Sequence, residues 1–186
     1  MKFTKYSATG NDFIILEEKF FDNISSNPEL IAKLCKRREG IGADGLLFYF
    51  EGDDKHDFKM RYFNADGLEV GMCGNGARAL VHYAHHEKKI TKNSFHFQVL
   101  SESYQAEIKG DLISLTMSDI KNPVLELPAW KEKFLHSYYV EVGVPHTVLF
   151  VDDLDSVDVD GLGREYAHDS VSVSYTHLTL PTTPYV

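Results

Sequence analysis

The chain has 186 residues, of which 43% are hydrophobic, so it can bury a substantial core in one domain or in two small lobes. A formal net charge of −9 argues against general nucleic-acid binding, and no apolar run approaches the ~20 residues of a membrane span. The two cysteines, Cys35 and Cys73, are too few for a disulfide framework or a cysteine zinc site. These features favour a cytoplasmic protein with free thiols and no partner among membranes or nucleic acids.

In the first quarter of the chain we expect strands over residues 2–6 and 13–18, separated by a turn-rich segment. A helix is predicted over residues 25–40, with Ser26 or Asn27 as its N-cap, Pro28 in its first turn and Gly40 at its end. Four residues form one apolar stripe of this helix: Leu30, Ile31, Leu34 and Cys35. The stripe predicts that Cys35 faces the core.

Residues 45–51 and 57–63 are predicted strands, and the sequence NADG (64–67) is predicted to be a turn. A second helix is expected over residues 75–89. Its apolar face is unusually wide and comprises Ala77, Ala79, Leu80, Val81, Tyr83 and Ala84. A face of this width indicates a helix enclosed by a sheet rather than one lying on a surface.

From residue 95 the apolar period changes to two, which predicts strands over 95–99, 104–108 and 113–117. Residues 120–130 are predicted to be a linker, and two further strands are expected on either side of a tight turn at GVPH (143–146). We therefore expect a first lobe over residues 1–118 and the incomplete start of a second lobe over 119–169. Residues 170–186 lack charge and continue no earlier pattern, so they are either a disordered tail or, as we prefer, non-native sequence.

Three features are candidates for chemistry, and two of them are weak. The sequence GNGARA (74–79) fits a dinucleotide-binding fingerprint, but no hydrophobic strand runs into its first glycine. His82 and His86 lie four residues apart on one helix face, with His85 between them, and such a pair could hold a metal. A third ligand and an H-E-x-x-H arrangement are absent, so solvated or hydrogen-bonded histidines are the simpler interpretation.

The third candidate is Cys73, which is either a buried small hydrophobic residue or a reactive thiol. It directly precedes the second helix, whose free N–H groups and dipole are expected to lower the pKa of the thiol. The same N–H groups could receive a carboxylate. A thiol in this position suits proton transfer at the α-carbon of an amino acid.

Four separated blocks resemble the diaminopimelate epimerase family: TGNDFIIL (9–16), GIGADGLL (40–47), MRYFNADGLEVGMCGNGARAL (60–80) and GVPHTV (143–148). The resemblance covers residues 1–168. It implies an α+β fold of two similar lobes, each a mixed sheet wrapped round a central helix. It also implies a cofactor-independent reaction that interconverts LL- and meso-2,6-diaminopimelate, a small-molecule substrate, through two cysteines on opposite faces of the α-carbon. A homodimer is left open for full-length members.

The resemblance also assigns roles to individual residues. Cys73 matches the catalytic cysteine of the first lobe, and His146 matches an active-site histidine in the family's G-x-P-H motif. The positions that match substrate-binding residues are Asn11, Asp44, Asn64, Gly74 and Asn75. From the sequence alone, Asn11 and Asn64 have a second interpretation as turn-forming residues.

The chain departs from the family pattern in two places. Val144 stands where the family commonly has an asparagine that contacts substrate. No second cysteine–glycine turn and no Glu-Arg pair follow residue 168, and Cys35 matches no cysteine motif. We therefore expect the second lobe to be incomplete and this chain alone to be inactive as an epimerase. The alternatives are a related isomerase of the same fold and an inert fragment.

Overall fold

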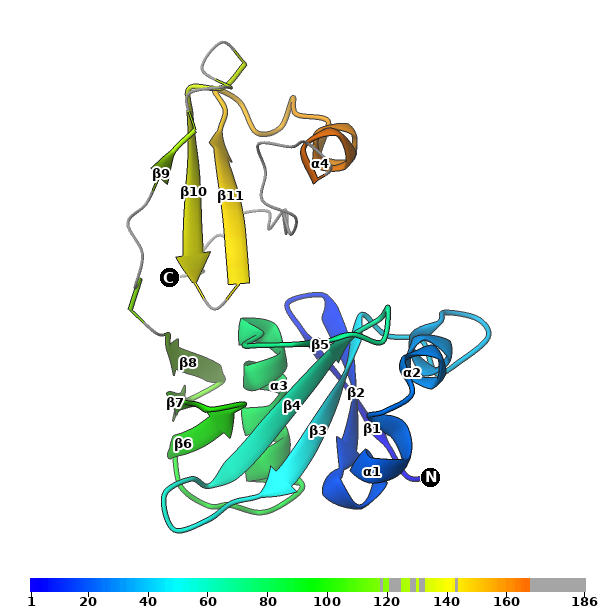
Figure 1. Ribbon diagram of the computed structural model, residues 1–186. Coiled ribbons are helices and arrows are strands. Elements are labelled where there is room, and N and C mark those ends of the chain that lie inside the picture. The colour runs from blue at the N-terminus through cyan, green and yellow to red at the C-terminus, as the bar shows by residue number, and fades with distance from the viewer. Residues whose placement is uncertain (118, 121–124, 128–129, 131–132, 143, 168–186) are drawn as a thin grey trace. The chain divides into compact units, whose positions relative to one another are not determined.

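The structure is a computed structural model that describes residues 1–117, 119–120, 125–127, 130, 133–142 and 144–167 (Figure 1). The chain divides into two compact units, Met1–Met117 and Ser118–Val186. The predicted tail at 170–186 lies outside the described residues, as does Gly143 of the GVPH sequence. No helix in the described part of the chain is long and apolar enough to cross a membrane.

The first unit is built on one mixed sheet with the strand order β1-β2-β3-β4-β6-β7-β8, and β5 pairs with β4 outside this path. Its strands are β1 (Thr4–Ala8), β2 (Asn11–Glu17), β3 (Gly45–Glu51), β4 (Phe58–Asn64), β5 (Glu69–Val70), β6 (Ser94–Val99), β7 (Glu102–Lys109) and β8 (Leu112–Thr116). Its helices are η1 (Glu18–Phe20), α1 (Phe21–Ile24), α2 (Pro28–Cys35) and α3 (Gly74–His86).

Two parallel strand pairs explain where the helices lie. The strands β2 and β3 are parallel, as are β4 and β6, whereas the other neighbours are antiparallel. Parallel strands need a crossover connection. The segment η1–α1–α2 supplies the first crossover, and α3 supplies the second.

The two crossovers cover opposite faces of the sheet. Both faces of β2 and β3 are therefore buried, and the sequences of these strands are continuous apolar runs. In β2, Phe13 and Ile15 pack in the cluster that contains α3, whereas Ile14 and Leu16 pack in the cluster that contains α1 and α2. Successive side chains of a strand point to opposite faces, so both faces must be apolar here. In β6 and β7, by contrast, buried and exposed positions alternate.

The sheet wraps round α3. This helix contacts β1 and β8 at the two ends of the strand order, and also β2, β3 and β4 between them. All six residues of its predicted apolar face are buried. The wide apolar face therefore correctly predicted a helix enclosed by the sheet.

The helix α2 is shorter than the sequence predicted. Asn27 is its N-cap, accepting a hydrogen bond from the N–H of Leu30, and Pro28 opens it, but it ends at Cys35 instead of Gly40. The chain turns back after Cys35, so that the N–H groups of Gly42 and Ala43 donate to the carbonyls of Leu34 and Cys35. These bonds satisfy the last carbonyls of the helix and stop it there.

The second unit contains a three-stranded antiparallel sheet in the order β11-β10-β9, formed by β9 (Leu125–Glu126), β10 (His136–Val142) and β11 (Val144–Phe150). The sequence placed a tight turn at residues 143–146, but β11 already begins at Val144 and Pro145 pairs with Glu141. A helix that the sequence did not predict, α4 (Val159–Ala167), contributes Tyr166 to a small core with Trp130 and Phe134. Trp130 is therefore a core residue and not the end of a linker.

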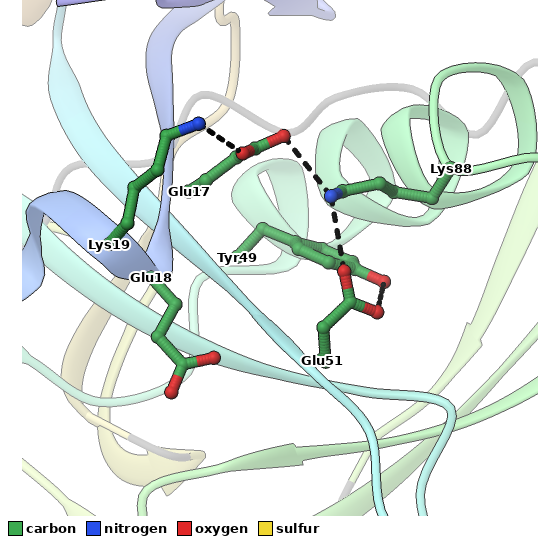
Figure 2. A pocket seen from close by; sticks show the side chains of 6 residues that line it. All are labelled: Glu17, Glu18, Lys19, Tyr49, Glu51 and Lys88. Atoms are coloured by element: carbon green, nitrogen blue, oxygen red, sulfur yellow. Dashed lines mark hydrogen bonds and ion pairs between the residues drawn. The ribbon is translucent and has the colours of Figure 1, made fainter.

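A pocket of about 330 Å³ lies in the first unit, at the opposite end of α3 from Cys73 (Figure 2). Lys88 lies between two carboxylates, with its Nζ 3.1 Å from Glu17 and 3.1 Å from Glu51, and over the ring of Tyr49. A second ion pair joins Glu17 to Lys19 at 3.0 Å. The hydrogen bonds that Glu17 accepts from Lys19 and, to a smaller extent, from Lys88 lower its pKa to about 2. The charges of Glu17, Lys19, Glu51 and Lys88 thus pair with one another at this pocket.

Candidate active site

The N-terminus of α3 places Cys73 at a position where its sulfur meets free backbone donors. Cys73 is the N-cap of the helix, and its Sγ accepts a hydrogen bond from the N–H of Gly76 at 3.4 Å. The first N–H groups of a helix have no acceptor within the helix, so those of Gly74 and Asn75 are also oriented toward this end. The side chain of Cys73 is half-buried.

The prediction that Cys73 has a lowered pKa is wrong. The sequence predicted a lowered pKa, but burial raises the pKa of the thiol above its ordinary value. The hydrogen bonds from Gly76 and Asn75 and the charge of Arg78 act in the predicted direction, yet they do not outweigh desolvation. A thiol of raised pKa is a stronger base once it has lost its proton, so burial makes Cys73 harder to ionise and more basic when ionised.

Cys35 differs from Cys73 in its burial and in its location, although burial raises the pKa of both thiols. It is 3% exposed and lies in the α1–α2 cluster, on the face of the sheet opposite to α3. Burial raises its pKa to about 11, and the charges of Asp12 and Asp44 add to this effect. The prediction that Cys35 faces the core is confirmed.

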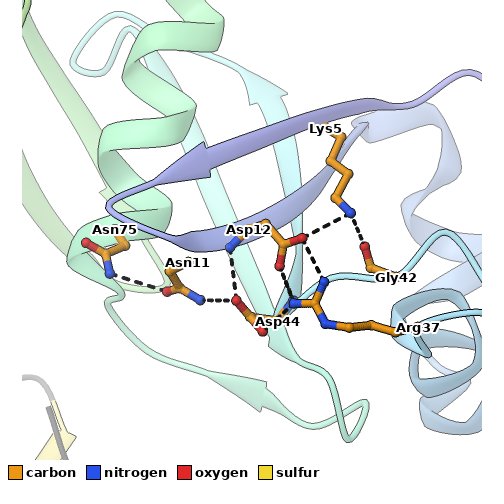
Figure 3. Close-up of polar contacts among 7 residues, drawn as sticks. All are labelled: Lys5, Asn11, Asp12, Arg37, Gly42, Asp44 and Asn75. Atoms are coloured by element: carbon orange, nitrogen blue, oxygen red, sulfur yellow. Dashed lines mark hydrogen bonds and ion pairs between the residues drawn. The ribbon is translucent and has the colours of Figure 1, made fainter. Parts of the chain in front are cut away.

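Three of the predicted substrate-binding residues are joined by hydrogen bonds (Figure 3). The amide Nδ2 of Asn75 lies 3.4 Å from Oδ1 of Asn11, and Nδ2 of Asn11 donates to Oδ2 of Asp44 at 2.9 Å. These residues come from the first turn of α3, the first residue of β2 and the residue before β3. The sheet thus brings together three polar side chains that are 64 and 33 residues apart in sequence.

A cluster of charges that the sequence did not reveal holds the far end of this chain of hydrogen bonds. Arg37 binds Asp12 through two hydrogen bonds, of 2.7 and 3.1 Å, and reaches Asp44 at 2.8 Å. Lys5 pairs with Asp12 at 3.0 Å. The hydrogen bonds from Arg37, followed by those from Lys5 and Asp44, hold the pKa of the Asp12 carboxyl well below its usual range, although burial opposes them. Asp12 is therefore a charged anchor.

A strained turn lies at the Asn75 end of this series of hydrogen bonds. Thr9 and Gly10 form the two-residue loop between β1 and β2, with φ angles of +54° and +85°. Left-handed backbone at both loop positions is typical of a type I′ turn, but it is unusual for a β-branched residue such as Thr9. The hydroxyl of Thr9 is shared between the carbonyl of Ala8, at 2.7 Å, and Oδ1 of Asn75, at 3.1 Å.

Asn64 lies at the end of β4 and has the turn role that its sequence context allowed. Its N–H donates to the carbonyl of Leu68 and its carbonyl accepts from the N–H of Gly67, both at 2.9 Å. Its half-buried side chain makes no hydrogen bond with the residues that the structure describes. His146 lies in the second unit, on β11 opposite Val140, and is half-buried. The structure does not place His146 relative to Cys73.

The histidines of α3 are occupied by local contacts. The rings of His82 and His86 stack 4.1 Å apart, His82 also meets the hydroxyl of Tyr6 at 3.3 Å, and His85 bonds to the carbonyl of Ile90 at 3.0 Å. Within the described part of the chain, no three His, Cys, Asp or Glu side chains are grouped to hold a metal ion.

Comparison with known proteins gives the family. The family model for diaminopimelate epimerase matches residues 3–120. The diaminopimelate epimerase of Flavobacterium psychrophilum is 39% identical over 98% of this chain and 70% of its own length. That of Campylobacter lari is 38% identical over 86% of this chain and 61% of its own length. The chain thus spans between about three fifths and seven tenths of the length of these relatives.

Solved structures agree on the fold. A PhzF-family phenazine biosynthesis protein from Bacillus anthracis superposes with a TM-score of 0.59 at 18% identity, over 83% of this chain and 58% of that protein. At this identity the likeness concerns the fold alone, and it confirms the α+β class with a mixed sheet round a helix. Taken with the site at the start of α3, these matches mean that the chain belongs to the diaminopimelate epimerase family.

Proposed function

We propose that this chain carries the first half of a cofactor-independent epimerase site for LL- and meso-2,6-diaminopimelate, with Cys73 as one of the two groups that transfer a proton. The observation that carries the proposal is the position of Cys73 Sγ at the helix N-cap, within reach of the N–H of Gly76 and beside the linked amides of Asn75 and Asn11. Family membership supports the substrate class.

Removal of the α-proton of an amino acid requires a strong base and stabilising donors, because this proton is very weakly acidic. Donors aimed at the α-carboxylate stabilise the charge that develops as the proton leaves, and exclusion of water strengthens these interactions. The N–H groups of Gly74 and Asn75 are the donors that we assign to the carboxylate. A thiolate of raised pKa is a stronger base than an ordinary thiolate, which suits Cys73 for removing the proton.

Epimerisation needs a second proton donor on the opposite face of the α-carbon. Cys35 cannot supply it from the other side of the sheet. In this proposal Asn64 contacts substrate, and His146 is an active-site residue, as its match to the family's G-x-P-H motif implies. We further propose a cytoplasmic enzyme of lysine and peptidoglycan-precursor synthesis that acts on a free small molecule, with a homodimer left open.

The test is incubation of the chain with each diaminopimelate isomer in deuterium oxide. We expect deuterium to enter at the α-carbon without inversion, because a single thiol removes and returns the proton on one face. Cys73→Ser is expected to abolish this exchange, and Cys35→Ser is the matched control that retains it. Full-rate epimerisation by this chain would rule out the two-thiol account, and absence of exchange would favour an inert fragment.

A further inference from the structure

The orientation of the Asn75 amide is determined by a charge on each side of it. The carboxylate of Asp44 can only accept hydrogen bonds, so Asn11 must present its NH₂ group to Asp44 and its oxygen to Asn75. Asn75 must then present its NH₂ group to Asn11. Its oxygen is consequently turned toward Thr9 and Arg78, and both of these residues donate to it. The network thus leaves one assignment for both amides.

Arg78 is the stronger of the two donors to Asn75. A guanidinium can only donate, so it would repel the NH₂ group of a flipped amide. The hydroxyl of Thr9 has a single proton and also lies 2.7 Å from the carbonyl of Ala8, so it could accept from a flipped amide. Arg78 therefore discriminates between the two orientations of Asn75, whereas Thr9 tolerates both.

The charge of Arg78 has no counter-ion among the described residues, although it is half-buried. Arg37, by contrast, pairs with two carboxylates, and Arg61 pairs with Glu69. Arg78 is the fifth residue of α3, and a positive charge near the N-terminus of a helix is unfavourable with respect to the helix dipole. The guanidinium of Arg78 lies beside Cys73 and Gly74, where its charge adds to a local positive potential that favours a thiolate or a bound carboxylate.

We propose that Arg78 is a positioning residue of the site: it locks the Asn75 amide with its NH₂ group toward Asn11 and keeps a positive charge beside Cys73. The residue acts through Asn75 and Cys73. The catalytic importance of Arg78 rests on the proposed function. Its effects on the Asn75 amide and on the reactivity of Cys73 can be measured without any turnover.

The experiment follows the side-chain amide resonances of Asn75 and the pH profile of Cys73 alkylation by iodoacetamide, measured on the Cys73 peptide by mass spectrometry. In Arg78→Met we expect the Asn75 amide resonances to move and the alkylation rate at pH 7.5 to fall about three- to tenfold, because a tenfold change corresponds to one pH unit in the thiol titration. Arg78→Gln keeps a donor but not the charge. Because its amide can also accept a hydrogen bond, this variant is expected to move the Asn75 resonances and to slow alkylation, as Arg78→Met does.

The matched control is Lys33→Met, which removes one positive charge from an exposed position on α2. Unmoved Asn75 resonances in a folded Arg78→Met variant, or equal slowing of alkylation in Lys33→Met, would overturn the proposal. The expected changes in a folded variant support the role of Arg78 even if the chain shows no α-proton exchange. Failure of the proposed function can therefore be told apart from failure of this inference. Arg78→Gln provides the same readouts where Arg78→Met does not fold.

Discussion

The side-chain amide of Asn75 donates a hydrogen bond of 3.4 Å to Oδ1 of Asn11, a residue 64 positions away in sequence. The bond connects the first turn of the central helix to the first residue of a strand in the sheet around it. Because Asn11 is itself held by Asp44, the start of α3 is joined to the charged cluster of Asp12 and Arg37. The geometry at Cys73 thus depends on residues far from it in the chain.

Replacing Asp44 by Asn is expected to loosen this connection. An amide at position 44 can present either its oxygen or its NH₂ group to Asn11, and it no longer attracts the guanidinium of Arg37. We expect the free energy of unfolding to fall by about 1 kcal/mol in urea denaturation. The matched control, Asp54→Asn, changes an exposed carboxylate in the β3–β4 loop and is expected to leave stability nearly unchanged. Equal losses in the two variants would contradict this assignment.

The thiols of Cys73 and Cys35 are expected to differ in reactivity. Burial raises the pKa of both thiols, but backbone N–H groups and the charge of Arg78 oppose this effect at the half-buried Cys73. Cys35 is 3% exposed, and the charges of Asp12 and Asp44 add to the effect of burial and bring its pKa to about 11. We predict that iodoacetamide modifies Cys73 in the native chain at neutral pH well before Cys35, as measured by peptide mass spectrometry. Equal rates in urea would show that the difference comes from the fold. Equal rates in the native chain would remove the support for an accessible reactive thiol.

Gly67 is predicted to be irreplaceable for a steric reason that Gly110 lacks. Both have left-handed backbone, with φ angles of +89° and +60°, but a Cβ on Gly67 would lie 2.1 Å from the carbonyl oxygen of Pro28, whereas one on Gly110 would meet nothing within 4 Å. We expect Gly110→Ala to cost about 1 kcal/mol from backbone strain alone and Gly67→Ala to cost several times more. Thermal unfolding of the two variants measures the difference, and equal costs would refute the predicted clash.

The pH dependence of stability should report the ion pairs of Glu17. Its pKa is lowered to about 2 in the folded chain, against about 4.3 for an ordinary glutamate. A lowered pKa contributes stability that is present above the ordinary pKa and is lost as the pH falls toward 2. We therefore expect Glu17→Gln to destabilise the chain at pH 6 and to have a shrinking effect toward pH 2, measured by urea denaturation. Glu18→Gln is the neighbouring control, and a pH-independent cost of Glu17→Gln would contradict the prediction.

The sequence by itself determined most strands, the burial of Cys35 and the enclosure of α3, and it limited the N-cap of α2 to Ser26 or Asn27, because each of these follows from local periodicity or capping chemistry. It did not predict α4 or the burial of Trp130, since these depend on packing between residues more than thirty positions apart. It also did not predict the early end of α2, which depends on the turn that brings Gly42 and Ala43 back to the last carbonyls of the helix. Motif resemblance selected Asn11, Asp44 and Asn75, but only the tertiary structure joined them. It also decided that Cys73 has a raised pKa, because the cost of burial exceeds the effect of the helix N–H groups. Arg37, Arg78 and Thr9 had no signal in the sequence, because their roles depend on which side chains the folded sheet brings within hydrogen-bonding distance.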